Sequence, residues 1–535
     1  RLYRPSDENS GESEIDTMQK YVDGIGVALE IEEVDALRAR YRDQGKIVVH
    51  CHGVFDLVHL GHLRHLDQAK QEGDVLFVSI TEDKFVNKGP HRPVFGEQLR
   101  AEMLLGLGVV DHVVISRAPS GFDVIERLKP DVYVKGEEYE ASEDDITQNI
   151  NKEVSAVESY GGKVVFTHDV TFSSSQLLNL NFDIFPPETT QYLNRLRDIY
   201  SAEKIFDSLA QVKDLKVAVL GDAIIDKYTF VTPMGKSAKG SFITVKRHYS
   251  EEQAGGAIAV ANHVGQFVSD VTLITGLGGD PKYGDNYEKF VRGKLADTVT
   301  PEFFHMADNP TLVKERFIDP EMNKLFEVYI IEDGLLRRDW HDTAAVEWLR
   351  DNIADYDVVI VPDYGNGFIT DSMVDVICDK SKFLAVNTQM NSGNQGYHAI
   401  TRYSRADFVA LNEPELRLGC HDPLSPIDEL ATAMAERLGT KFLSVTQGPK
   451  GVMTVNHELA DRQTVVPALA TKVVDRIGAG DAFLSLAAVC HGAGVDPELA
   501  SFLGSVSAAL DVQIVGNSEP IDPIALHKYV VSLLK

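Results

Sequence analysis

Short apolar runs alternate with stretches whose apolar positions recur at helical spacing along almost the whole chain. This alternation is typical of α/β folds, in which helices connect mainly parallel strands. In the first third, the runs lie beside plausible helices over 61–71 and 96–107, and they predict one small doubly wound domain. The strands expected there are Ile47–Cys51, Val75–Ile80, His112–Ile115, Val132–Val134 and Lys163–Thr167.

The pattern breaks after Asn181, where the sequence reads FDIFPPETTQ. Pro186 and Pro187 disfavour a regular element, so we expect a domain junction there. A helix over 192–211 should then lead into a second α/β domain, in which residues 228–250 alternate as antiparallel strands do. The other strands expected are Lys216–Leu220, Val271–Thr275, Val358–Val361, Phe383–Val386, Phe408–Ala410 and Phe442–Val445.

The chain length supports this division, since 535 residues exceed what one hydrophobic core usually organises. Hydrophobic residues make up 44% and charged residues 25% of the chain, as in ordinary globular proteins. The expected fold class is therefore α/β, with two doubly wound domains. The expected segments are 1–44 as an N-terminal extension and leading helix, 45–182 as the first domain, 183–211 as a linker and helix, and 212–535 as the second domain.

Charge and cysteine usage narrow the possible surroundings. The formal net charge of −29 argues against nucleic acids and membranes as partners, because both attract a basic surface. Small phosphate-bearing ligands stay compatible, since a few cations in a pocket suffice for them. The four cysteines lie far apart and favour neither a disulfide framework nor a zinc site. With no apolar run long enough to span a bilayer and no signal-peptide core, we expect a cytoplasmic protein.

The segment IVVHCHGVFDLVHLGHLRHL contains the first candidate site. Its strand ends near His52, Gly53 permits a tight turn, and a helix opens at HLGH, residues 59–62. A helix N-terminus offers unpaired N–H groups and a positive dipole end to a phosphate, and two imidazoles can stabilise charge that develops on phosphoryl oxygens. Taken alone, the tetrapeptide is equally compatible with an ordinary helix start or with a pair of metal ligands.

The surrounding motifs favour phosphate chemistry. GVFDxxHxGH resembles the motif of the cytidylyltransferase-like nucleotidylyltransferases, which join a nucleoside triphosphate to a phosphorylated acceptor and release pyrophosphate. KGPHRPV, EQLRAEML, VKGEEY and TFSSSQLL follow in that family's order, and KGEEY is most similar to the adenylyltransferase half of the ADP-heptose synthesis enzyme. The resemblance implies catalytic roles for His59, His62 and Lys88, an acceptor contact by Arg100, and nucleotide contacts by Gly53, Val54, Phe55, Asp56, Gly61, Arg92, Lys135, Gly136, Ser173, Ser174 and Ser175.

The segment VVDRIGAGDAFLSLAAV contains the second candidate site. A β-like run turns at Gly478, Ala479 and Gly480, and a helix begins near Asp481. Small residues let successive N–H groups converge on a phosphoryl group, and a carboxylate beside them can take a proton from an acceptor hydroxyl. Taken alone, GAGD is more often a tight turn with aspartate as helix N-cap.

Ordered motifs again favour the chemical interpretation. DxxGAGD, preceded by GDxxxD, GG, DYxxG, NEPE and TQGPKG, resembles the signature of the ribokinase-like, or PfkB-type, sugar kinases. The resemblance implies a small β-lid over the sugar, Asp481 as the catalytic base and Glu415 as an indirect magnesium contact. It implies nucleotide or anion-hole contacts by Asn412, Glu415, Thr446, Gly448, Gly451, Gly478, Ala479 and Gly480, and sugar contacts by Asp222, Asp226, Gly255, Gly256, Asn262 and Asp363.

Two segments depart from the heptose-kinase pattern. Residues 387–389 read Asn-Thr-Gln where that pattern has Asp-Pro-Lys. The segment SAKGSFITVKR stands where that pattern has a proline-rich segment that contains a glutamate. The transferase also precedes the kinase, whereas the familiar fusion has the kinase first. These differences leave the sugar and the nucleotide base open.

The resemblances together predict a bifunctional enzyme of nucleotide-sugar synthesis. Its kinase would phosphorylate the anomeric hydroxyl of a heptose 7-phosphate-like sugar, and its transferase would join a sugar 1-phosphate to a nucleoside triphosphate, with ATP favoured. One alternative is a CTP-dependent enzyme for a polyol phosphate or capsule precursor. Another is a transferase whose kinase-like domain serves as a sensor or dimerisation module. The resemblances also imply Mg²⁺, ATP or CTP as substrate, and a homodimer formed through the kinase domain.

Overall fold

The computed structural model divides the chain into two compact units, Arg1–Ile184 and Phe185–Leu534. Within the described residues, no helix is long and apolar enough to cross a bilayer, and all four cysteines are free thiols. The structure describes residues 21–22, 25–26, 28–86, 92–136, 149–167, 185–236, 240–279, 287–307, 309–331, 340–394, 396–457 and 463–534.

The smaller unit is built on a five-stranded parallel sheet in the order β5-β4-β3-β6-β7. Every residue of its strand β4 is buried, as expected for a central strand of a parallel sheet covered on both faces. Side chains of α3 and α4 form one core against the sheet, and side chains of α2 and α5 form another. The elements are α2 (Val34–Asp43), β3 (Val48–Gly53), α3 (Leu60–Gln71), β4 (Val75–Thr81), α4 (Glu97–Leu105), β5 (His112–Ser116), α5 (Phe122–Leu128), β6 (Val132–Gly136), α6 (Asn149–Ser159) and β7 (Lys163–Thr167).

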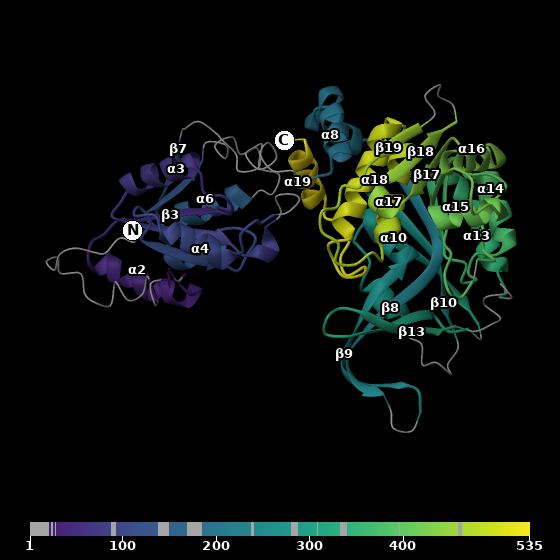
Figure 1. Cartoon of the computed structure of the whole chain (residues 1–535), viewed down its shortest axis with the longest axis horizontal. Helices are drawn as coiled ribbons and strands as arrows, with labels where there is room; N and C mark the ends of the chain where they lie inside the picture. The colour runs from purple at the N-terminus through teal and green to yellow at the C-terminus, as the bar shows by residue number, and fades with distance from the viewer. Residues whose placement is uncertain are drawn as a thin grey trace. The chain divides into compact units, whose positions relative to one another are not determined.

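The larger unit is a three-layer α/β structure (Figure 1). Its main strands are β8 (Lys216–Lys236), β10 (Asp270–Gly278), β11 (Val299–Met306), β14 (Val358–Asp363), β15 (Leu384–Thr388), β16 (Phe408–Asn412), β17 (Phe442–Thr446), β18 (Val452–Asn456) and β19 (Gln463–Val466). They follow the order β11-β10-β8-β14-β15-β16-β17-β18-β19, parallel as far as β17 and antiparallel beyond it.

Helices cover both faces of this sheet. They are α10 (Ala257–Gly265), α11 (Tyr287–Arg292), α13 (Thr343–Asn352), α14 (Asp371–Lys380), α15 (Glu413–Cys420), α16 (Ile427–Leu438), α17 (Ala479–Gly492), α18 (Pro497–Asp511) and α19 (Pro523–Leu533). Figure 1 shows α10, α17, α18 and α19 on one side of the sheet, and α13, α14, α15 and α16 on the other. Each side has its own large apolar core, and the two-sided cover confirms the doubly wound fold class expected from the sequence.

Strand β8 extends beyond the main sheet and helps to form a second layer of strands, which we call the lid. Its distal half pairs antiparallel with β9 (Ile243–Gly256) and parallel with β12 (Leu312–Ile318). Strand β12 pairs in turn with β13 (Lys324–Ile330). The antiparallel strands predicted over 228–250 are therefore confirmed, and Figure 1 shows β9 projecting away from the helical layers.

The segment expected as one helix over 192–211 forms two helices instead. Pro187 begins α8 (Pro187–Ile199), where proline is tolerated because its missing N–H has no helical partner. Tyr200 is extended, and Ser201 caps α9 (Ala202–Ala210) by accepting from the Lys204 N–H. Buried side chains of both helices join the core of the larger unit, so they belong to that unit, whereas the sequence predicted a linker and helix.

Candidate functional sites

In the smaller unit, the two histidines of HLGH lie at the N-terminus of α3, beyond the carboxyl end of β3. The Nδ1 of His59 accepts from the Gly61 N–H at 3.1 Å, and the Nδ1 of His62 faces the His59 N–H at 3.4 Å. The ring centroids are 4.0 Å apart. Because each neutral imidazole uses Nδ1 as an acceptor, its proton resides on Nε2, which can donate to a ligand. Burial lowers the pKa of His59, which favours this neutral form.

Asp56 forms hydrogen bonds with the backbone just after Lys88, which was expected to bind phosphate. Its buried carboxylate accepts from the Val94 N–H at 2.6 Å and the Phe95 N–H at 3.1 Å. The same carboxylate forms an ion pair of 3.2 Å with Arg92. Both residues were expected to contact the nucleotide, and the structure shows them holding each other and the backbone of this segment.

Arg100 forms several hydrogen bonds within the smaller unit. Its side chain is fully buried and donates to the carbonyls of Val54 and Thr81, at 2.6 and 2.7 Å, and to the Asp83 carboxylate at 2.6 Å. A fourth hydrogen bond reaches the Phe95 carbonyl. These bonds use four of the five N–H donors of the guanidinium, so Arg100 supports the fold, and the acceptor contact implied by the resemblance stays a prediction.

Lys135 lies at the carboxyl end of β6, where the nucleotide was expected, but it also has an internal partner. Its ammonium lies 3.2 Å from the buried Glu153 carboxylate, which also accepts from the Tyr133 hydroxyl at 2.8 Å. Four other expected residues, Lys88, Ser173, Ser174 and Ser175, lie outside the described residues. Among the described residues, no group of three or more potential metal ligands occurs, which gives the metal-ligand alternative for HLGH no support.

In the larger unit, the GAGD turn begins α17 beside the carboxyl ends of the parallel strands. Gly478 has a φ of 101°, a left-handed conformation that favours glycine, and its position is crowded by Asp511 and Asn517. A Cβ on Gly480 would meet nothing within 4 Å. The first backbone N–H groups of a helix have no partner within the helix, and such groups can bind a phosphoryl group.

Asp481 lies in the first turn of α17 and is 8% exposed. The Tyr364 hydroxyl donates to its Oδ1 at 2.8 Å. Burial raises the pKa of Asp481 to about 7, an effect that the Tyr364 hydrogen bond opposes and the nearby Asp226 carboxylate reinforces. A carboxylate that titrates near neutral pH is suited to accepting and releasing a proton.

Tyr364 is held by a turn that the sequence motifs did not identify. The side-chain amides of Asn391 and Asn394 donate to the Tyr364 carbonyl at 2.6 and 3.1 Å. Gly365 follows with a φ of 65°, and a Cβ there would lie 2.7 Å from the His398 ring. The sequence NSGN was the available signal, since asparagine and glycine together are typical of tight turns.

Two residues that were expected to contact the sugar form hydrogen bonds with backbone groups. Asp222 accepts from the N–H groups of Asn366 and Phe368 at 3.3 and 3.0 Å, and burial with the neighbouring Asp363 raises its pKa to about 6. The Asn262 amide is also occupied: it donates to one backbone carbonyl and accepts one backbone N–H, at Lys294 and Ala296. Both side chains therefore support the local backbone, and their expected sugar contacts stay predictions.

Asp363 is likewise enclosed by partners. Arg402 approaches its Oδ2 at 2.7 Å, the Tyr403 hydroxyl donates to the same oxygen at 2.6 Å, and His398 lies 3.1 Å from Oδ1. The carboxylate is 1% exposed, and these partners hold its pKa well below its ordinary value despite its burial. Asp363 thus forms internal ion pairs beside Tyr364, and its expected sugar contact stays a prediction.

Asp226 is another residue expected to contact the sugar. It lies on β8 where the strand enters the lid, and it forms a buried ion pair with Arg316 of β12. Gly255 is needed opposite it, because a Cβ there would collide with the Asp226 carboxylate. Gly256 has a φ of 62°, and a Cβ there would lie 2.5 Å from the Asp222 carbonyl oxygen. The paired glycines thus permit the close approach of β8 and β9.

The residues expected to bind the nucleotide lie at the carboxyl ends of β16 and β17. Asn412 and Glu415 form a capping box at the start of α15, each side chain accepting the other's backbone N–H at 2.9 Å. Glu415 also accepts from the Met390 N–H at 3.1 Å, and burial raises its pKa to about 6. Thr446 lies beside Asn412 in register. Gly448 and Gly451 follow β17 with positive φ angles.

Asn387, the first residue of the departing Asn-Thr-Gln segment, has a structural use. Its side-chain amide donates to the Ala410 carbonyl at 2.8 Å and thereby ties β15 to β16. Gln389 is linked to the neighbouring strand through its backbone, which donates to the Asp363 carbonyl at 2.9 Å. The Asn-Thr-Gln segment therefore stays hydrogen-bonded to both neighbouring strands.

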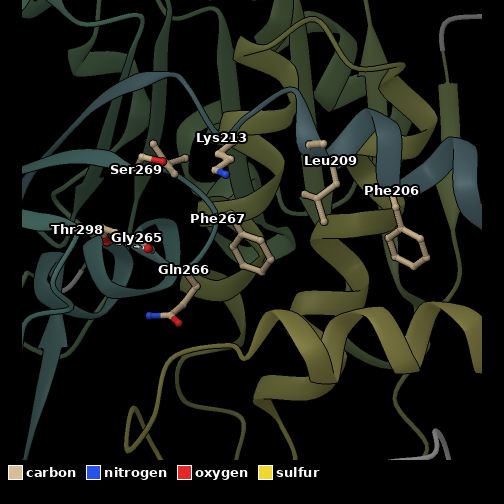
Figure 2. A pocket seen from close by; sticks show the side chains of 10 residues that line it. Phe206, Leu209, Lys213, Gly265, Gln266, Phe267, Ser269 and Thr298 are labelled. Atoms are coloured by element: carbon tan, nitrogen blue, oxygen red, sulfur yellow. Dashed lines mark hydrogen bonds between the residues drawn. The ribbon is translucent and has the colours of Figure 1, made fainter. Parts of the chain in front are cut away.

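A separate cavity of about 330 Å³ lies at the opposite ends of the strands (Figure 2). Lys213, Ser269 and Thr298, which precede β8, β10 and β11, line it together with Phe206 and Phe267. The strands point away from this cavity toward the GAGD turn. None of the residues expected in the active sites lines it.

Comparisons with known families agree with both motif assignments. Residues 214–524 match the pfkB family of carbohydrate kinases, and residues 50–180 match the cytidylyltransferase-like family. The two matches confirm the resemblances found in the sequence and support a bifunctional enzyme with a kinase and a nucleotidyltransferase domain.

Curated relatives match the N-terminal part of the chain. The bifunctional protein HldE of Syntrophotalea carbinolica is 37% identical over 146 residues, which are 26% of this chain and 28% of that protein. HldE of Sulfurimonas denitrificans is 43% identical over 111 residues, 20% of this chain and 23% of that protein. These alignments span about a quarter of the relatives' length. The order of the two domains is reversed relative to HldE.

Solved structures similar to this chain include two sugar kinases. Ribokinase from Thermotoga maritima is 21% identical, covers 60% of this chain and 99% of its own, and gives a TM-score of 0.45. Phosphofructokinase-2 from Escherichia coli in complex with fructose-6-phosphate is 14% identical, covers 60% of this chain and 100% of its own, and gives a TM-score of 0.47.

Proposed function

Because the chain belongs to the pfkB family of carbohydrate kinases, we propose that its larger unit phosphorylates a sugar phosphate with ATP and that its smaller unit transfers a nucleotidyl group to a sugar 1-phosphate. The observation that carries the kinase assignment is the juxtaposition of Asp481, with a pKa of about 7, and the GAGD turn at the N-terminus of α17. A base and a phosphoryl-binding nest at one place are what hydroxyl phosphorylation requires.

In the proposed kinase reaction, Asp481 accepts the proton of the sugar hydroxyl as that oxygen attacks the terminal phosphoryl group of ATP. The backbone N–H groups after Gly478 stabilise the charge on the transferring phosphoryl oxygens. Tyr364 is a positioning residue that orients the Asp481 carboxylate. The sugar would lie between Asp481 and the lid, on the side where Asp226 pairs with Arg316.

Magnesium would lie near Asn412 and Glu415. Each Glu415 oxygen accepts one backbone N–H, from Asn412 or Met390, which leaves further lone pairs for water molecules of a hydrated ion. Mg²⁺ usually keeps several waters when it binds beside phosphates, so these residues fit an ion contacted through water. The ion would neutralise negative charge on the nucleotide phosphates.

In the proposed transferase reaction, the acceptor phosphate attacks the α-phosphoryl group of the nucleoside triphosphate and pyrophosphate leaves. His59 and His62 donate from Nε2 to oxygens that gain charge in this step, and the α3 N-terminus adds its dipole. The buried pair of Asp56 and Arg92 supports the segment after the proposed Lys88 loop.

The sugar 1-phosphate acceptor and the preference for ATP rest on the KGEEY segment and on the HldE relatives of the smaller unit. We therefore propose ADP-heptose-like nucleotide-sugar synthesis, in a reducing compartment that suits the four free thiols. The purified chain should release pyrophosphate faster from ATP than from CTP when offered heptose or hexose 1-phosphates. Faster release from CTP, with a polyol phosphate as acceptor, would establish the cytidylyltransferase alternative.

The proposed base gives the kinase a defined pH dependence. Asp481 works as a base only when deprotonated, so kcat/KM should rise as pH increases through about 7 and then level off. Tyr364→Phe should move the midpoint to higher pH, because the hydrogen bond that it removes stabilises the charged carboxylate of Asp481. A pH profile of sugar phosphorylation measures both. An unchanged midpoint in this variant would contradict the positioning role of Tyr364.

We further propose that the chain forms a homodimer through the lid. Large apolar side chains are exposed there, from Ile330 at 36% to Met234 at 68%, and exposed apolar surface of this kind commonly marks an interface. Light scattering should show a dimer, and Ile243→Asp should shift it toward monomer by burying a charge in the interface. A monomeric unmutated chain at working concentration would contradict this proposal. The exposed lid residues are Met234, Phe242, Ile243, Tyr249, Met322, Phe326, Val328 and Ile330.

A further inference from the structure

Lys314 lies at the centre of the lid surface that faces the GAGD turn. In the strand register it stands between Asp226 of β8 and Tyr329 of β13, so these three side chains share one face of the lid. The amide of Asn517 links this face to the turn: its Nδ2 lies 3.4 Å from the Asp226 carboxylate, and its Oδ1 would lie 2.7 Å from a Cβ on Gly478.

The ammonium of Lys314 also lies near the proposed base. It is 6.0 Å from the centroid of the Tyr364 ring, whose hydroxyl donates to Asp481. It is 5.2 Å from the centroid of the Tyr329 ring on the lid. Lys314 therefore borders the space between the lid and Asp481, where the acceptor sugar is proposed to bind.

Lys314 lies near several carboxylates but forms no ion pair with a described residue. The side chain is 5% exposed, and within the described parts of the larger unit no carboxylate forms an ion pair with it. Its neighbour Arg316, by contrast, is paired with both Asp226 and Glu327. Burial lowers the pKa of Lys314, as expected for a cation withdrawn from water. The nearby carboxylates of Asp226, Glu327 and Asp222 oppose this effect in part, and a bound anion would oppose it further.

We propose that Lys314 binds the phosphate group already carried by the acceptor sugar and thereby selects phosphorylated over unphosphorylated sugars. The inference rests on the proposed kinase function of the same site. The transferred phosphoryl group is expected at the N-terminus of α17, whereas Lys314 is on the lid strand β12, on the acceptor side. A fixed cation at this site would oppose the repulsion that a chain with a net charge of −29 exerts on anionic substrates.

The test compares sugars with and without their phosphate. Sedoheptulose 7-phosphate, glucose 6-phosphate and mannose 6-phosphate, each beside its parent sugar, are offered to the full chain, and both calorimetric binding and ATP-dependent phosphorylation are measured. The unmutated chain should bind at least one phosphorylated sugar more tightly than its parent. Lys314→Met should weaken that binding about 10- to 100-fold, as expected for a lost charge-assisted hydrogen bond, and leave parent-sugar binding within about threefold.

Lys216→Met is the matched control. Lys216 begins β8 at the opposite end of the sheet, and its ammonium also lies over a tyrosine ring, that of Tyr356 at 4.8 Å. This variant should keep the full preference for the phosphorylated sugar. The inference is overturned if the unmutated chain shows no preference, or if Lys314→Met weakens both sugars equally. It is also overturned if only kcat falls, which would place Lys314 on the transferred phosphoryl group. Binding is measured without turnover, so an inactive kinase would contradict the proposed function separately.

Discussion

Asp481→Asn is expected to lower the kcat of sugar phosphorylation by about 10²–10⁴-fold, the usual contribution of a positioned general base. The amide keeps the shape of the side chain and can still accept from the Tyr364 hydroxyl, but it cannot take the proton of the sugar. Steady-state phosphorylation of the best acceptor in the sugar-phosphate panel measures the loss. ATP binding should change little, because the proposed nucleotide contacts lie at the ends of β16 and β17.

Asp270→Asn is the control for this experiment. Asp270 is exposed at the first residue of β10, at the end of the sheet away from the GAGD turn. Its variant should retain full activity. Sugar phosphorylation by Asp481→Asn at more than a tenth of the unmutated rate would show that another group serves as the base. Pyrophosphate release by the smaller unit should be unaffected in both variants.

His59→Ala and His62→Ala should each lower the rate of pyrophosphate release by about 10²–10³-fold, because each removes one positioned donor to a charged oxygen. The donors are on Nε2, since the Nδ1 atoms face backbone N–H groups. Pyrophosphate release from ATP with a sugar 1-phosphate measures this loss. Sugar phosphorylation should remain within about twofold, because the two proposed sites lie in separate compact units.

His65→Ala is the matched control on the same helix. His65 bonds the Thr167 hydroxyl at 2.7 Å and lies one turn beyond the HLGH motif. The variant His65→Ala should lower the rate of pyrophosphate release far less than His59→Ala does. If both activities fell together in His59→Ala while the chain stayed folded, the two sites would not be independent.

The fold was largely predictable from the sequence because buried parallel strands are short continuous apolar runs. The run Val75–Thr81 is buried at every position, and the predicted strand Lys163–Thr167 has the same bounds in the structure. The break between α8 and α9 was not predictable from periodicity, since the apolar spacing continues through Tyr200 and only the cap at Ser201 ends it.

The sites were predictable only where a residue type is tied to a local backbone feature. His59 and Asp481 both lie in the first turn of a helix or at its cap, which the glycine pattern indicates. Arg100 and Asp363 match the residue types of the motifs, but they form hydrogen bonds or ion pairs with residues distant in the sequence. A sequence motif does not contain those distant partners. Lys314 was missed for the converse reason, since only strand register places it opposite Asp226.

The central claim is that one chain catalyses two reactions, sugar phosphorylation and nucleotidyl transfer. The most direct measurement uses one preparation of the unmutated chain with Mg²⁺ and follows two reactions: phosphorylation of heptose and hexose phosphates by ATP, and pyrophosphate release from nucleoside triphosphates with sugar 1-phosphates. We predict both reactions, and we expect Asp481→Asn to impair only the first and His59→Ala only the second. Pyrophosphate release without phosphorylation of any sugar, together with weak ATP binding by the larger unit, would contradict the claim and establish a sensor or dimerisation role for that unit.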